Sequence, residues 1–154
     1  MGAAWVPRLI ALLGLLALVH SLTRPWASVR VIALRLDYKP WELLEQMARG
    51  KWDLVNELLR VAEEIPEGAR FVSLFTLHLA FLVIALLLGF LSIIGNSAGG
   101  YASTAVFSTL SVAVLVYTLE QAQLLSFSIG SGALLSIGAA FVYVLSALAA
   151  RSFK

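Results

Sequence analysis

The sequence predicts an all-α integral membrane protein, a four-helix bundle with a long first loop that contains an amphipathic helix. Hydrophobic residues make up 60% of the chain and charged residues only 13%, whereas soluble domains have about 45–50% and about 25%. Four segments reach the length of roughly 20 apolar residues that a bilayer requires. Most of the charged residues fall between the first two of these segments. The chain is therefore expected to form a single membrane domain.

The predicted membrane-spanning helices are residues 3–22, 71–95, 101–119 and 124–149. The first resembles a signal peptide because Arg8 precedes an apolar run, but no small-x-small cleavage site follows, so we expect it to be retained. The turn-forming residues 96–100 and the polar link 120–123 are both short. Because short links make successive helices run in opposite directions, we expect the last three helices to be antiparallel neighbours.

The distribution of charge predicts where the protein lies in the cell. Residues 23–70 carry eight of the 11 Lys and Arg residues. The positive-inside rule places this loop in the cytoplasm and the chain in the cytoplasmic (plasma) membrane, as a multi-pass protein. A net charge of only +2 argues against a nucleic-acid partner. The absence of cysteine excludes disulfides and thiolate metal sites, and the scarcity of Asn favours a thermophilic source.

Residues 40–65 of the loop are predicted to form one amphipathic helix. Apolar residues recur three and four positions apart, and an eleven-residue repeat places Trp41 and Trp52 on the same face. Gly50, at the edge of that face, permits a kink. The candidate interaction residues of this helix are Trp41, Leu44, Trp52, Val55 and Leu59.

The apolar face of this helix is expected to contact protein rather than lipid. The opposite face is acidic, whereas a helix that binds anionic lipid carries Lys and Arg there. We therefore expect Trp41 and Trp52 to be buried against the helices of the same chain, another copy or a partner subunit. Of these three, packing within the monomer is the simplest.

Residues 26–38 lie between the first predicted helix and the amphipathic helix. Apolar and polar residues alternate imperfectly along this segment. The pattern fits either a short strand or an extension of the first helix, and it does not decide between them.

Small residues recur every four positions in the last predicted helix, at Ser128, Gly132, Ser136 and Ala140. Such a face lets two helix backbones approach closely and supports helix association in lipid. We therefore expect Ser128, Gly132 and Ser136 to contact the helix at 101–119. Gly132 should be the position that tolerates a larger side chain least.

Three ionisable residues, His20, His78 and Glu120, fall in or near the membrane on the side of the first loop. Ionisable groups at this depth are costly and are therefore candidates for function. Together they could bind haem or a metal, or relay protons to a quinone. In the simpler interpretation, His20 and Glu120 are hydrated at the interface, and His78 bonds to Thr76 or to a backbone carbonyl. Because no His-x-x-x-His spacing is present, we predict no catalytic residue, metal site or cofactor.

These features favour a non-catalytic small polytopic membrane protein that acts as an accessory subunit or a self-assembling scaffold of a membrane complex. Its expected partners are the lipid bilayer and either copies of itself or a larger complex. The first alternative is a redox or proton-handling subunit that binds haem, a metal or a quinone through His20, His78 and Glu120. The second is a small transporter or channel, with a narrow pore lined by hydroxyls such as those of Ser108 and Ser136. No family signature is recognised in the sequence.

Overall fold

In the computed structural model, the described residues are 5–31, 34–65, 67–122 and 126–152. The predicted helix starts at residues 3 and 124 lie outside these ranges. Within them the chain forms helices and short strands in the order α1 (Val6–Leu22), β1 (Ala27–Val31), β2 (Leu34–Tyr38), α2 (Pro40–Ala48), α3 (Asp53–Glu63), α4 (Gly68–Gly95), α5 (Ala98–Gln121), β3 (Ser126–Ile129) and α6 (Ser131–Ser152). Most of the described residues are helical, as predicted, and the three short strands form one small sheet.

Three of the described helices, α4, α5 and α6, are long and apolar enough to cross a membrane. This is compatible with a multi-pass membrane protein. The remaining long helix, α1, is apolar but has 17 residues, which is the lower limit of the range of about 17–25 residues for a spanning helix. The predicted bundle of four spanning helices is therefore not confirmed.

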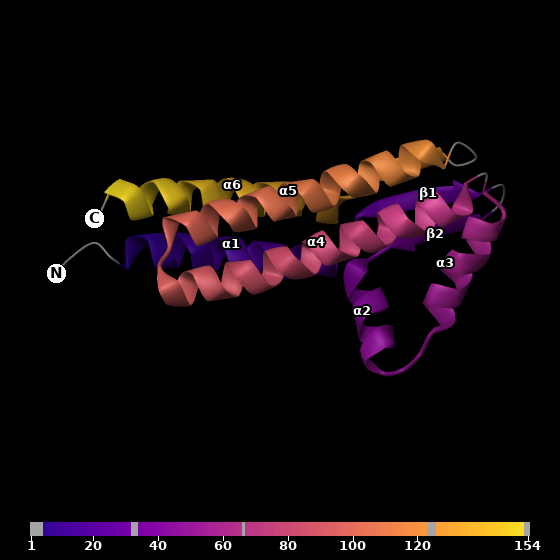
Figure 1. Ribbon diagram of the computed structural model, residues 1–154, viewed down its shortest axis with the longest axis horizontal. Helices are drawn as coiled ribbons and strands as arrows, with labels where there is room; N and C mark the ends of the chain where they lie inside the picture. Colours follow the sequence, from indigo (N-terminus) through magenta and orange to yellow (C-terminus); the bar gives the residue numbers. More distant parts are fainter. Residues whose placement is uncertain (1–4, 32–33, 66, 123–125, 153–154) are drawn as a thin grey trace.

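The four long helices lie side by side, and the first turn of α1 lies at the same end of the molecule as the last turn of α6 (Figure 1). α4 packs on α5, α5 on α6, and α6 on α1. The expected packing of the last three helices as neighbours is thus confirmed. Between α4 and α5, Asn96 adopts a left-handed conformation with φ 45°. Ser97 then caps α5 by accepting a hydrogen bond from the Gly100 amide at 3.2 Å.

Residues 26–38, which the sequence left undecided, form strands rather than an extension of α1. The sheet has the order β2-β1-β3, and both pairs are antiparallel. Ala27 is buried and Arg30 is exposed, as expected for a strand that turns alternate side chains toward a core. β3 occupies residues that were predicted to begin the last membrane helix, so that prediction was wrong at its start. The reason is the edge of β1, whose unpaired backbone groups bond to β3 from Ala27 to Arg30.

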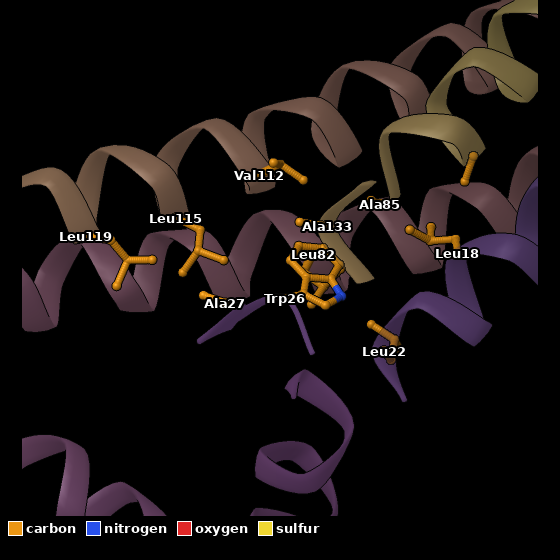
Figure 2. Packing of buried hydrophobic residues seen from close by; sticks show 11 residues of the cluster. Leu18, Leu22, Trp26, Ala27, Leu82, Ala85, Val112, Leu115, Leu119 and Ala133 are labelled. Atoms are coloured by element: carbon orange, nitrogen blue, oxygen red, sulfur yellow. The ribbon is translucent and has the colours of Figure 1, made fainter. Parts of the chain in front are cut away.

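Trp26 lies where the sheet, α1 and the long helices meet. Its side chain is fully buried, and its Nε1 donates a hydrogen bond to the Ser21 carbonyl at 2.8 Å. Figure 2 shows the ring among side chains from several elements, which form one apolar cluster. The buried members of the cluster are Leu18, Leu22, Trp26, Ala27, Leu82, Ala85, Val112, Leu115, Leu119, Ala133 and Ala139.

The predicted amphipathic helix 40–65 is in fact two helices, α2 and α3, so the prediction of one helix was wrong. α2 ends in a Schellman motif: the Gly50 amide bonds to the Met47 carbonyl at 3.1 Å and the Lys51 amide to the Gln46 carbonyl at 2.8 Å. This motif needs a left-handed residue, and Gly50 supplies it with φ 69°. Figure 1 shows α2 and α3 projecting sideways from the long helices, at the end where the sheet lies. We refer to residues 40–63 as the arm.

Candidate functional site

His78 is fully buried in α4 and bonds to two other elements. Its Nε2 lies 3.0 Å from the hydroxyl of Tyr38 in β2. Its Nδ1 lies 2.8 Å from the backbone carbonyl of Ser111 in α5 and 2.9 Å from the Ser111 hydroxyl. The imidazole therefore joins the sheet to the α4–α5 pair.

The geometry of these bonds assigns the proton positions. A carbonyl only accepts, so Nδ1 of His78 carries the hydrogen that bonds to the Ser111 carbonyl, and Nε2 accepts from Tyr38. The Ser111 hydroxyl donates to the His78 carbonyl at 3.2 Å. Burial raises the pKa of Tyr38 above its ordinary value, which keeps the phenol protonated and able to donate. Both imidazole nitrogens are thus bonded to protein, so a metal or haem could reach His78 only by displacing Tyr38 or Ser111.

Aromatic rings surround this network. The ring centroid of His78 lies 5.4 Å from that of Trp26 and 5.7 Å from those of Tyr38 and Phe75. The imidazole itself is fully buried, and a hydrogen bond strengthens in such an apolar setting. The arrangement holds the sheet against α4 and α5.

The other two predicted candidates, His20 and Glu120, are exposed at the ends of α1 and α5. The Nε2 atom of His20 accepts a hydrogen bond from Arg24 Nε at 3.4 Å. Neither residue is among the hydrogen-bond or ring partners of His78. In the part of the chain that the structure describes, no group of three His, Asp or Glu residues could hold a metal ion.

The residues predicted to form one small-residue face of the last helix lie in different surroundings. Ser136 meets α5 as expected, because its Oγ lies 2.8 Å from Ser108 Oγ, and Ser108 also bonds to the Ser136 carbonyl at 3.1 Å. The nearest neighbours of Gly132 are Trp26 and the carbonyls of Ser21 and Arg24, rather than residues of α5 as predicted. Ser128 lies in β3 and is exposed. The hydroxyls of Ser108 and Ser136, which we considered as a pore lining, bond to each other.

The arm leaves its two tryptophans uncovered. Trp41 is 48% exposed and Trp52 is 51% exposed, so the expectation that the chain itself buries them was wrong. Of the other predicted interaction residues, Leu59 is also exposed, whereas Leu44 and Val55 are partly buried. The chain turns at Gly50, so α2 and α3 do not form the single continuous apolar face that was predicted. The predicted interaction residues therefore differ in exposure.

An open pocket of about 270 Å³ lies between the arm, the sheet and the α4–α5 pair. Its lining is mainly apolar and comes from six elements, with Tyr38 linking it to the His78 network. The lining residues are Ala27, Val29, Leu36, Asp37, Tyr38, Glu42, Leu54, Glu57, Leu58, Phe71, Phe75, Leu115 and Leu119. All the charged residues among them are acidic, and all three are exposed, so the rim of the pocket is acidic.

The three carboxylates at the rim differ in their partners. Asp37 accepts a hydrogen bond from the Ser28 hydroxyl at 2.6 Å and pairs with Arg35 at 3.2 Å. The bond from Ser28, followed by that from Arg35, lowers the pKa of Asp37 and keeps it charged. Glu42 pairs with Lys39 at 2.7 Å. Glu57 has no hydrogen bond or ion pair to the described residues, so its charge is uncompensated.

Comparison with protein-family models and with curated proteins finds no match. Sequence reasoning missed Tyr38 and Ser111 as partners of His78. It named Thr76, whose hydroxyl in fact donates to the Val72 carbonyl of its own helix at 2.8 Å. It also named a backbone carbonyl, and the structure identifies this as the carbonyl of Ser111. The pocket was missed altogether, because it forms only when six separate elements pack together.

Proposed function

We propose that this protein is a non-catalytic assembly subunit, either a self-assembling scaffold or an accessory subunit of a membrane complex. The observation that carries the proposal is the exposure of Trp41 and Trp52 on the arm. The arm lies outside the three helices that are apolar enough to span a membrane. We place the protein in the cytoplasmic membrane, with the arm on the cytoplasmic side, as the positive-inside rule predicts.

Energetics supports an interface at the arm. Burial of one aromatic side chain removes about 150–250 Å² from water, and each Å² of apolar area contributes roughly 25 cal/mol. Two half-exposed tryptophans therefore offer a few kcal/mol to any partner that covers them. Tryptophan is also among the residues that contribute most to binding at protein interfaces.

The His78 network supports a structural role for the membrane part. Both imidazole nitrogens bond to protein groups that belong to other elements. A histidine used in this way fixes the sheet, and through it the base of the arm, relative to α4 and α5. A rigid base is what an arm that binds a partner requires, because a preorganised surface loses less entropy on binding.

We expect Trp41→Glu and Trp52→Glu to reduce assembly of the protein. A charged side chain on this surface cannot be buried against a partner without a large desolvation cost. Native mass spectrometry of the protein extracted in mild detergent measures the assembled mass. The wild type should be an oligomer or part of a larger complex, and each Glu variant should lose at least part of that mass.

Conservative variants provide the control. Trp41→Phe and Trp52→Phe keep an apolar ring and should assemble like the wild type. Circular dichroism should show equal helix content in all four variants, because both positions are half-exposed in the single chain. A wild type that is monomeric and carries no partner in native extracts would contradict the proposed function.

A further inference from the structure

We propose that the tip of the arm of one copy docks into the pocket of a neighbouring copy, where Trp52 enters the apolar pocket and Lys51 pairs with Glu57. This inference rests on the proposed function and identifies the partner as a second copy of this chain. Two features of the structure support it: the tip carries an exposed aromatic ring beside a free cation, and the pocket is apolar with an acidic rim.

The tip is the connection between α2 and α3. The Schellman motif at Gly50 fixes its backbone, and the Leu54 amide bonds to the Gln46 side chain at 3.3 Å, so the turn is held on both sides. Lys51 is exposed, and the described residues contain no carboxylate that pairs with it. Trp52 is 51% exposed beside it. The tip thus presents a cation and an indole ring on a rigid turn.

The pocket is complementary to this tip in size, polarity and charge. Its volume of about 270 Å³ is near the lower end of the range for small-molecule pockets, roughly 300–1,000 Å³, and an indole is smaller than a drug-sized ligand. Phe71 and Phe75 provide aromatic surface within it. At the rim, Asp37 and Glu42 already have basic partners, whereas Glu57 has none in the described chain. Glu57 is therefore the carboxylate that gains most from an incoming lysine.

The placement of the arm makes this contact feasible in a membrane. The spanning helices set the direction across the bilayer, and the arm projects sideways from them (Figure 1). Copies inserted in the same orientation carry tip and pocket on the same side of the membrane. Two copies can exchange tips reciprocally in a two-fold dimer, or each tip can enter the pocket of the next copy, which gives a ring or an open row.

Cysteine cross-linking tests the contact directly, since the natural chain contains no cysteine. Chains with Lys51→Cys and chains with Glu57→Cys, which both keep Trp52, are co-expressed with different tags and oxidised in the membrane. We expect disulfide-linked heterodimers that contain one chain of each kind, at a yield at least about fivefold above that of either homodimer. Homodimers alone, or no cross-link in membranes where the wild type is assembled, would overturn the inference.

Charge reversal tests the ion pair in the full-length protein. Lys51→Glu and Glu57→Lys should each raise the dissociation constant of assembly by about fivefold, the upper end of the range for an exposed ion pair. The double variant Lys51→Glu/Glu57→Lys should restore it. Glu63→Lys makes the same charge change at an exposed position outside the pocket and should have little effect. Failure of the double variant to recover would count against the pairing.

The outcomes also separate this inference from the proposed function. A monomeric wild type contradicts both. If the wild type assembles and Trp52→Glu disrupts it, while co-expressed Lys51→Cys and Glu57→Cys chains fail to cross-link, the arm binds a different surface or a different protein. In that case the proposed function stands and the tip-in-pocket contact is wrong.

Discussion

Replacement of His78 by alanine is expected to lower the free energy of unfolding by about 3 kcal/mol, since it removes a buried ring and leaves buried polar groups without partners. The Tyr38 hydroxyl loses its acceptor, and the Ser111 carbonyl loses a donor. The apolar shell loses contacts as well, because Trp26 and Phe75 pack on the imidazole. Unfolding in mixed detergent micelles, followed by circular dichroism, measures the change.

The other histidine provides the control for this prediction. His20 is exposed at the end of α1, so His20→Ala should change stability by less than about 0.5 kcal/mol. Tyr38→Phe removes only the hydroxyl and should cost about 1 kcal/mol. In the His78→Ala background the same Tyr38→Phe change should cost less, because the bond is already lost. Equal stability of His78→Ala and His20→Ala would show that the network does not hold the sheet in place.

The span-capable helices were predictable because length and apolarity are local properties of the sequence. α4 and α5 lie close to the predicted ranges 71–95 and 101–119. The start of α6 was not predictable in the same way. It begins at Ser131 because the preceding residues pair with β1, from a segment about 100 positions earlier in the chain. A strand that forms through a partner so distant in sequence leaves only a weak local pattern.

The sequence of the arm around Gly50 is compatible with two different structures. The sequence around Gly50 predicts a kink in one helix, because the apolar spacing continues on both sides of it. A glycine that follows a helical stretch also fits the position after a helix C-cap, where a left-handed conformation ends the helix. The structure has this second arrangement. As a result, the stripe that includes Trp41 and Trp52 does not form one continuous surface.

The candidate site was predicted only in part. His78 was singled out because a buried imidazole needs partners, and this reasoning was sound for that residue. His20 and Glu120 were predicted to act with His78 only because they lie at a similar depth in the membrane. Depth alone does not determine which side chains are in contact. The partners Tyr38 and Ser111 belong to a strand that the sequence left undecided and to a helix with several serines. No local pattern distinguishes Ser111 from the other hydroxyls of α5.

Gly132 is the second position where a substitution should have a large effect. A Cβ atom at this position would overlap Trp26 Cδ1 and would lie 2.7 Å from the carbonyl oxygens of Ser21 and Arg24. Two of these three neighbours are backbone atoms, which cannot rotate away. The Gly132 amide is also bonded to the Pro25 carbonyl at 2.9 Å, so the helix start cannot move outward without losing that bond. The junction of α1, β1 and α6 therefore depends on the absence of a side chain here.

Gly132→Ala is accordingly expected to lower the free energy of unfolding by about 3 kcal/mol, at the upper end of the usual cost of overpacking, and Gly132→Leu should lower it further. Gly138→Ala in the same helix is the matched control, because a Cβ there meets nothing within 4 Å. It should stabilise α6 by about 0.5–1 kcal/mol, since glycine is the weaker helix former. Unfolding in mixed micelles compares the two variants, and tryptophan fluorescence, in chains whose other three tryptophans are replaced by Phe, reports on the environment of Trp26. If Gly132→Ala is as stable as Gly138→Ala, the close approach of α6 to Trp26 is absent in the membrane, and the small residues of α6 serve another neighbour.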